Sequence, residues 1–340
     1  MVYEIIASIF GIMQIANILA YFLYKPNKKR YSKIPKYQIV VVTVGDDRVL
    51  PSLREVVEKL ESLNLNYIIL SSRELKEFKN VLVVPKEKDG NKYRAIKWFV
   101  ENYVKDDVWY VFLDDDSYPM DDSFLHDIAY AEEKGYHFGN GILVPRPGKS
   151  KWAYALDWIR YFDDLTRFRF NALIKKPVYG IHGELLMVKG SVLKEIWLTM
   201  DESITEDFNF AMHAMEKGYK FFQSSCKVSI KSPNSLKDFI RQRARWANIF
   251  RDSLKHKNLI PIIYAFTGFL VSPLFFYLWL LYGSTLASIA GMYYIFVYLY
   301  GSIKARTIPF VTHALSVIEV AGSIIGLLRN NKKFVVIDKS

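Results

Sequence analysis

The most constraining feature of this sequence is a short apolar run, residues 108–113, that ends in Asp114, Asp115 and Asp116. The run is rich in valine and aromatic residues and is followed by Pro119, which is typical of an interior strand of a parallel sheet. Ligands in open α/β sheets bind at the carboxyl ends of the strands, where these carboxylates lie. The sequence therefore predicts an α/β fold with an acidic ligand site at one edge of its sheet.

The spacing of the three aspartates indicates a metal site. Asp114 and Asp116 share one face of an extended chain, whereas Asp115 faces elsewhere. Two like charges this close repel unless a cation or protons intervene, and Mg²⁺ or Mn²⁺ suits oxygen ligands. With Cys226 as the single cysteine and no regular ligand spacing among six histidines, metal binding is expected from carboxylates. The alternative is a strand end followed by a solvated acidic turn.

Composition and patterning predict an integral membrane protein. The chain of 340 residues is 51% hydrophobic and 16% aromatic yet carries a net charge of +11, which is typical of apolar segments with basic flanks. Residues 3–24 span about 33 Å as a helix, enough for a hydrocarbon core of about 30 Å. Glu4 precedes this run and basic residues follow it at 25–36, unlike a signal peptide. We expect a retained membrane helix at 1–25, with its carboxyl end cytoplasmic.

The carboxyl-terminal part of the chain is also apolar. Residues 258–303 are nearly continuous in this respect, and Gly283 and Ser284 divide them into two expected membrane helices. A further crossing at 307–328 would place the basic tail outside, so we expect an interfacial or re-entrant helix there. A third carboxyl-terminal membrane helix is the alternative. Residues 329–340 are then a cytoplasmic tail.

Between the apolar ends, the pattern is typical of βαβ units. Strands are expected at 37–44, 67–70 and 81–84, and helices at 51–63 and 89–104, as in half of a doubly wound nucleotide-binding sheet. Neither a P-loop nor a dinucleotide fingerprint occurs. The aromatic stretch at 151–170, with Trp152 and Trp158, fits a membrane-surface helix, a sugar-stacking wall or packing against the sheet.

Three motifs on the predicted cytoplasmic domain carry a family resemblance: Asp114-Asp-Asp116, Glu206-Asp207, and Gln242-Arg-Ala-Arg-Trp246. In this order and spacing they resemble the DxD, (T)ED and QxxRW motifs of membrane-bound family-2 glycosyltransferases, which include cellulose and hyaluronan synthases. The resemblance implies a GT-A type, doubly wound nucleotide-sugar-binding domain at 37–235. An interfacial helix carrying the QxxRW motif follows at 236–257.

A closer resemblance is to the egghead-type β-1,4-mannosyltransferases, which pass mannose from GDP-mannose to a glycolipid. One departure concerns the nucleotide base: Ser71 and Ser72 stand where many family-2 enzymes carry an aspartate that contacts it, which leaves the base identity open. The matching segments are Lys231-Ser-Pro233, Asp238-Phe239, the QxxRW motif, Val317-Ile-Glu319, Gly326-Leu327 and Lys332-Lys-Phe-Val-Val336.

The resemblance implies a role for each motif. A metal on Asp114 and Asp116 would neutralise the departing pyrophosphate, and Asp207 would be the general base in a single inverting displacement. Donor-binding residues are expected to be Asp114, Asp116, Gln242, Arg243, Arg245 and Trp246, with Thr43, Lys92 and Arg94 as secondary candidates. On the acceptor side we expect His182, Gly183, Glu206 and Trp246.

The expected partners are a nucleotide-diphosphate sugar, with GDP-mannose favoured, a lipid-linked or glycolipid acceptor, and the membrane. A processive polysaccharide synthase using a UDP-sugar and a polyprenyl-phosphate sugar synthase are alternatives within the same class. A non-enzymatic membrane protein that recruits lipid or nucleic acid is the alternative from another class. Its basic clusters would be 25–36 and 237–257, but both adjoin apolar segments and no nucleic-acid-binding motif accompanies them, so no nucleic-acid partner is expected.

Overall fold

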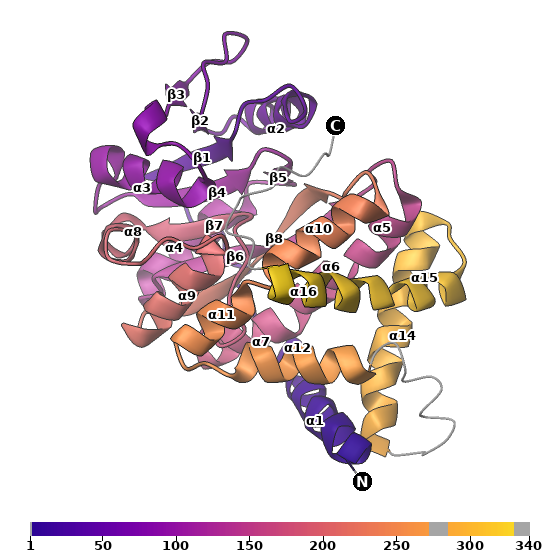
Figure 1. Cartoon of the computed structure of the whole chain (residues 1–340). Coiled ribbons are helices and arrows are strands. Elements are labelled where there is room, and N and C mark those ends of the chain that lie inside the picture. Colours follow the sequence, from indigo (N-terminus) through magenta and orange to yellow (C-terminus); the bar gives the residue numbers. More distant parts are fainter. Residues whose placement is uncertain (1, 272–284, 330–340) are drawn as a thin grey trace.

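The protein is built on an eight-stranded mixed sheet, which the computed structural model shows in Figure 1 for residues 2–271 and 285–329. The strand order is β3-β2-β1-β4-β7-β6-β8-β5. Strands β1 to β4 pair in parallel, whereas β7 is antiparallel to both β4 and β6. The strands are β1 (Tyr37–Thr43), β2 (Tyr67–Ser71), β3 (Val81–Val83), β4 (Trp109–Asp114), β5 (Ser117–Pro119), β6 (Phe138–Arg146), β7 (Leu186–Lys189) and β8 (Phe221–Lys231).

Strand β4 is the interior strand that the apolar run predicts, because both of its faces are buried. Trp109, Val111 and Leu113 pack with α2 (Leu50–Ser62) and α4 (Ser123–Lys134). Tyr110 and Phe112 pack on the opposite face, with α3 (Lys92–Tyr103), α8 (Gly190–Trp197) and α9 (Glu206–Glu216). A strand with helices on both sides has no polar face, which explains its continuous apolar sequence.

The amino-terminal half follows the predicted βαβ order, with one displaced helix boundary. The helix expected at 89–104 begins at Lys92, because the Asn91 side chain caps it by accepting from the Arg94 amide. A single 3₁₀ turn, η1 (Lys86–Lys88), precedes it. The sheet is mixed because β7 enters beside β4 in the antiparallel direction, which the local pattern of 186–189 does not reveal.

A second layer of helices packs beside the sheet. It begins with α5 (Lys151–Asp157), α6 (Ile159–Leu165) and α7 (Arg167–Ile174), and continues with α10 (Leu236–Trp246), α11 (Ile249–Lys255), α12 (Ile260–Val271) and α14 (Thr285–Ala305). The aromatic stretch at 151–170 packs against α14. Trp158 is 5% exposed and meets the Tyr300 ring edge-on at 5.2 Å, and Phe162 meets the same ring at 5.2 Å.

Two stretches are helical, long and apolar enough to cross a membrane, Glu4–Leu23 and Pro309–Leu328. The first lies in α1 (Val2–Leu23), which extends from the sheet domain beside α14 in Figure 1 and exposes Ile12 and Phe22. The two crossings expected at 258–303 fall on α12 and α14, neither of which is one of these two stretches, so they stay a prediction. The division expected at Gly283 and Ser284 lies outside the described residues.

The second stretch is broken at Ser316 into α15 (Pro309–Leu315) and α16 (Val317–Arg329). Helix α16 lies across α10 (Figure 1), and its glycines make the contact. A Cβ at Gly322 would stand 2.8 Å from Cβ of Arg243, and one at Gly326 would collide with the main-chain oxygen of Ala244. One face of α16 is therefore covered by α10. The expected tail at 330–340 lies outside the described residues.

Candidate active site

A cavity of about 500 Å³ opens where β1 and β4 end and where α9, α10 and α16 approach the sheet. It gathers side chains from the three sequence motifs, which are far apart in the chain. Of the predicted site residues it is lined by Thr43, Lys92, Asp114, Asp116, His182, Gly183, Glu206, Asp207, Gln242, Arg243, Arg245 and Trp246.

Arg94 is the exception among the predicted site residues. Its Nε lies 3.0 Å from Oε2 of Glu202, and its side chain is about half exposed and absent from the cavity lining. Arg94 is two residues beyond Lys92 on α3, so the two side chains point in different directions. We therefore withdraw Arg94 from the donor-binding set.

The three aspartates differ in their surroundings, although all of them line the cavity. The alternation expected of a strand ends at Asp114, the last residue of β4, because the chain turns at the next two positions. As a result Asp115 also reaches the site, where its Oδ2 accepts from the Thr43 hydroxyl at 2.7 Å. Asp116 is 4% exposed. The expectation that Asp115 faces elsewhere is wrong, and its carboxylate holds the Thr43 hydroxyl.

Lys92 connects the DxD motif to the acidic pair at the start of α9. Its Nζ lies 2.6 Å from Oδ1 of Asp114 and 3.2 Å from Oε1 of Glu206. Burial alone would lower the pKa of this ammonium, but the neighbouring carboxylates raise it. A Cβ at Gly183 would lie 2.9 Å from Nζ of Lys92 and 3.6 Å from Oδ2 of Asp207. Glycine at this position thus keeps open the space between the ammonium and that carboxylate.

Asp207 has the properties of a general base. It stands in the first turn of α9, where its Oδ1 accepts from the Phe208 amide at 2.7 Å. Burial and the charge of neighbouring Glu206 raise the pKa of Asp207 to about 7. A carboxylate with a raised pKa is a stronger proton acceptor than an ordinary aspartate and is still largely ionised just above neutral pH.

This pKa predicts a pH dependence. Because only the ionised form of Asp207 accepts a proton, kcat/KM should reach a plateau above pH 7 and fall about tenfold per pH unit well below it. The profile should be measured from pH 5.5 to 9 at saturating metal, so that metal loss does not mimic base protonation. A flat profile across pH 6–8 would remove Asp207 from this role.

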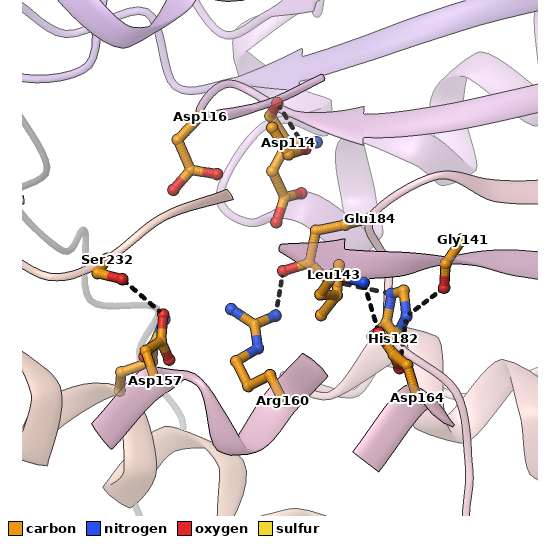
Figure 2. Close-up of polar contacts among 12 residues, drawn as sticks. Asp114, Asp116, Gly141, Leu143, Asp157, Arg160, Asp164, His182, Glu184 and Ser232 are labelled. Atoms are coloured by element: carbon orange, nitrogen blue, oxygen red, sulfur yellow. Dashed lines mark hydrogen bonds and ion pairs between the residues drawn. The ribbon is translucent and has the colours of Figure 1, made fainter. Parts of the chain in front are cut away.

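The wall opposite the aspartates is a buried ionic network (Figure 2). Arg160 and Glu184 pair at 2.5 Å, and His182 lies 3.2 Å from Asp164 and 3.3 Å from Glu184. Although burial lowers it, these two carboxylates raise the pKa of His182 to about 9. His182 is therefore a cation at neutral pH, held in place beside Gly183.

Figure 2 shows Asp114 and Asp116 on one side of the site and the Arg160–Glu184 pair on the other. Sequence reasoning missed Arg160 and Asp164, because it assigned 151–170 by its aromatic residues, and it missed Glu184, whose partners are distant in the sequence. The signal was present in Arg160, Asp163, Asp164 and Arg167, whose 3–4-residue spacing marks one charged helix face.

The QxxRW motif on α10 is more structural than expected. Arg243 is 5% exposed, and its Nη2 lies 3.2 Å from Asp157 of α5 and 3.6 Å from Glu319 of α16. Its guanidinium also stacks 4.2 Å from the centre of the Trp246 ring, over which Arg160 lies at 5.0 Å. Arg243 thus ties α10 to α5 and α16, and guanidinium groups cover the Trp246 ring.

Among the residues that the structure describes, Trp246 is the only tryptophan that lines the cavity. Trp152 and Trp158 are absent from it, so the sugar-stacking wall proposed for 151–170 is wrong. Apolar helices supply another part of the lining instead, namely Pro261, Tyr264 and Ala265 of α12 and Tyr294 of α14. The cavity therefore extends from the charged strand ends to the apolar helices.

The departure at Ser71 and Ser72 has a structural counterpart. The Ser72 hydroxyl donates to Oδ1 of Asp89 at 2.7 Å, and both residues line the cavity near the end of β2. An acidic side chain is thus present beside Ser72, and the loop before α3 supplies it.

The donor set of the cavity fits a hard divalent cation. Carboxylates outnumber cationic side chains among the lining residues, and three of them follow one another at the end of β4. A nucleotide diphosphate is an anion, so this acidic region repels it unless a cation intervenes. Asp114 and Asp116 offer the oxygen ligands that Mg²⁺ and Mn²⁺ prefer.

A half-sheet of parallel strands with carboxylates at the strand ends, facing a basic helix motif, is the arrangement expected of a GT-A glycosyltransferase. Residues 109–318 match the family described as glycosyl transferase family group 2, and the chain belongs to this family. The predicted glycosyltransferase class and α/β GT-A-type fold are thus confirmed, whereas metal dependence and inversion stay predictions.

The relatives and a solved structure agree with this assignment. The Caenorhabditis elegans β-1,4-mannosyltransferase bre-3 is 26% identical over 302 residues, covering 76% of this chain and 66% of its own length. The Drosophila melanogaster β-1,4-mannosyltransferase egh is 27% identical over 245 residues, covering 66% and 53%. The match thus spans less than two thirds of these relatives. The mannosyltransferase PcManGT from Pyrobaculum calidifontis, solved with GDP-Man and Mn²⁺, shares the fold with a TM-score of 0.58 at 14% identity, covering 97% of this chain and 100% of its own.

Proposed function

We propose that the protein is a metal-dependent, inverting mannosyltransferase that moves mannose from GDP-mannose to a hydroxyl of a lipid-linked or glycolipid acceptor. The observation that carries the proposal is the link through Lys92, which joins Asp114 to Glu206 beside Asp207 within one cavity. The names of bre-3 and egh, and the GDP-Man in PcManGT, support the choice of sugar and donor.

In the proposed reaction, Asp207 accepts the proton of the acceptor hydroxyl as that oxygen attacks the anomeric carbon of mannose. The bond from that carbon to the diphosphate oxygen breaks, and GDP leaves with the bonding electrons. A divalent ion held by Asp114 and Asp116 would supply Lewis-acid neutralisation of the diphosphate. A single displacement inverts the α-linked donor to a β-linked product without a covalent enzyme intermediate.

Glu206 and Lys92 control the basicity and the position of Asp207. The negative charge of Glu206 beside Asp207 raises the pKa of Asp207, which makes it more basic. Lys92 holds Glu206 in place through a 3.2 Å ion pair and balances part of the local negative charge. Glu206 is thus proposed to position the base, in addition to its expected place on the acceptor side.

The lipid-linked acceptor is supported by the apolar end of the cavity. Tyr264 and Tyr294 come from α12 and α14, which pack against the apolar helix α1. An acceptor anchored in a bilayer would be concentrated and oriented there, which lowers the entropic cost of bringing its hydroxyl to the donor. The three membrane helices expected from the sequence would be too few to build a polysaccharide channel, so we propose one added sugar per event.

The donor and the product size test this proposal. Purified protein with source membranes should incorporate label from GDP-mannose, with Mg²⁺ or Mn²⁺, into a short chloroform-soluble product. UDP-sugars and other nucleotide sugars serve as parallel donors. Long polymer would favour the processive synthase. Efficient transfer from a UDP-sugar but none from GDP-mannose would overturn the mannose assignment and leave the glycosyltransferase class intact.

The proposed topology predicts a labelling pattern. We propose an external amino terminus and a cytoplasmic catalytic domain, with 307–328 interfacial and 329–340 cytoplasmic. In a Cys226→Ala background, cysteines at Ser32 and Ser340 should react with an impermeant maleimide only after permeabilisation, whereas one at Val2 should react in intact cells. Native Cys226 is buried. Labelling at position 340 in intact cells would mean that 307–328 crosses the membrane.

A further inference from the structure

A second group of potential metal ligands lies outside the cavity, at the far end of the helix that carries Asp207. His213 and Glu216 are on α9, and His256 follows α11. One ligand atom from each side chain lies within 4.8 Å of the other two. Nδ1 of His256 is 2.7 Å from Glu216, Nδ1 of His213 is 3.8 Å from it, and the two imidazole rings are 4.6 Å apart.

A hydrogen-bond chain behind the cluster orients one of the histidines. Asn209 donates through Nδ2 to the main-chain oxygen of Asp201 at 2.9 Å, which leaves its Oδ1 as the acceptor. That oxygen lies 2.9 Å from Nε2 of His256, which therefore carries the proton. The other ring nitrogen of His256, Nδ1, faces Oε1 of Glu216 at 2.7 Å. Histidines that bind metals are commonly held by such a partner on the other ring nitrogen.

The other histidine, His213, has a ring nitrogen available for ligation. Its Nε2 is buried without a hydrogen-bond partner among the described residues. The charged groups around the cluster are Glu216, Asp201 and Lys255, and the last two pair with each other. Two imidazoles beside one carboxylate match the donor preferences of zinc.

We propose that His213, Glu216 and His256 form a binding site for a divalent transition metal of the zinc class, with water in the remaining position. Ligand atoms of a tetrahedral zinc ion lie about 3.3 Å apart, given zinc–nitrogen bonds of about 2.0–2.1 Å. The observed separations bracket that value, so small side-chain rotations complete the site. It is separate from the Asp114–Asp116 site in position and in ligand type.

A metal bound at this site would restrain α9 by fixing it to α11. At the amino-terminal end of α9, the hydroxyls of Ser203 and Thr205 donate to Asp252 of α11 at 2.6 and 2.8 Å. A metal at the other end would fix α11 to α9 a second time. The helix that presents Asp207 would then be held at both ends against the segment that follows the QxxRW motif.

Cobalt binding tests the site without reference to activity. The sample is the full-length protein, purified without a polyhistidine tag and stripped with EDTA. It carries Asp114→Asn and Asp116→Asn, which remove the other metal site. One equivalent of Co²⁺ should produce the visible absorption of a tetrahedral centre, and Zn²⁺ should abolish it. His213→Ala should lose the band, and Glu216→Gln, at an exposed position, should weaken binding about tenfold or more. Glu58→Gln, an exposed glutamate on α2, is the matched control and should bind as the parent does.

Thermal unfolding with and without Zn²⁺ tests the site even if one of the variants folds poorly. Zn²⁺ should raise the melting temperature of the parent and of Glu58→Gln, but not that of Glu216→Gln, because a ligand stabilises only the state that binds it. Absence of the cobalt band in the parent would overturn the proposal. Equal binding by the parent, His213→Ala and Glu216→Gln would overturn it as well. Neither result bears on the proposed mannosyl transfer.

Discussion

Asp207→Asn is expected to lower kcat by about 10²–10⁴-fold, the range typical of a lost general base, while leaving donor binding largely intact. The amide has nearly the shape of the carboxylate but accepts no proton. Donor affinity depends on the Asp114–Asp116 side of the cavity, so titration of GDP with metal should give similar affinities for the variant and the parent. A loss of activity below about tenfold would transfer the role to another residue.

Stability and a matched variant separate this effect from misfolding. A raised carboxyl pKa means that ionised Asp207 destabilises the folded state above the unfolded pKa of about 3.9. Asp207→Asn should therefore melt at the same or a higher temperature at pH 8. Glu206→Gln should keep measurable turnover but shift the pH profile to lower pH, because it removes the neighbouring charge that helps to raise the Asp207 pKa.

Asp116→Asn is the second substitution with a large expected effect. Replacing a carboxylate ligand by a neutral amide should reduce transfer by about 10²-fold or more, since metal neutralisation of a leaving diphosphate is worth several kcal/mol. It should also weaken Mn²⁺-dependent GDP binding in calorimetric titrations.

Asp115→Asn is the comparison for Asp116→Asn. The Asp115 carboxylate is engaged by the Thr43 hydroxyl, so a smaller loss is expected. Normal metal-dependent turnover of Asp116→Asn would show that Asp116 does not hold the metal.

The sheet and the acidic half of the site were predictable because their signals are local. The apolar run before Asp114 identified β4, and strand ends determine where a ligand site lies. The position of Asp207 in the first turn of a helix followed from its neighbours in sequence. These inferences need only the period of a strand or a helix, together with the family motifs.

What the sequence could not reveal depends on long-range pairing. Arg243 looked like a phosphate ligand because a motif does not show that Asp157 and Glu319 already hold it from two other helices. The pair of Arg160 with Glu184 likewise joins positions 24 residues apart. Trp158 and Phe162 pack on α14 instead of lining the cavity, since a ring that packs on a helix and one that stacks on a sugar have the same sequence pattern.

The histidines were missed for the same reason. His213 and Glu216 are three residues apart on one helix, which is a recognisable spacing, but His256 comes from another helix. Only the contact between α9 and α11 brings it near.

The central claim is inverting transfer of mannose from GDP-mannose, and the anomeric configuration of the product tests it most directly. Purified protein should be incubated with GDP-mannose labelled at C1 and with acceptor lipid from source membranes, and the isolated product examined by NMR, with Asp207→Asn as the inactive control. Inverting transfer predicts a single β-linked mannose in the wild-type product and none with the Asp207→Asn variant. An α-linked product, or label released only as free mannose, would contradict it.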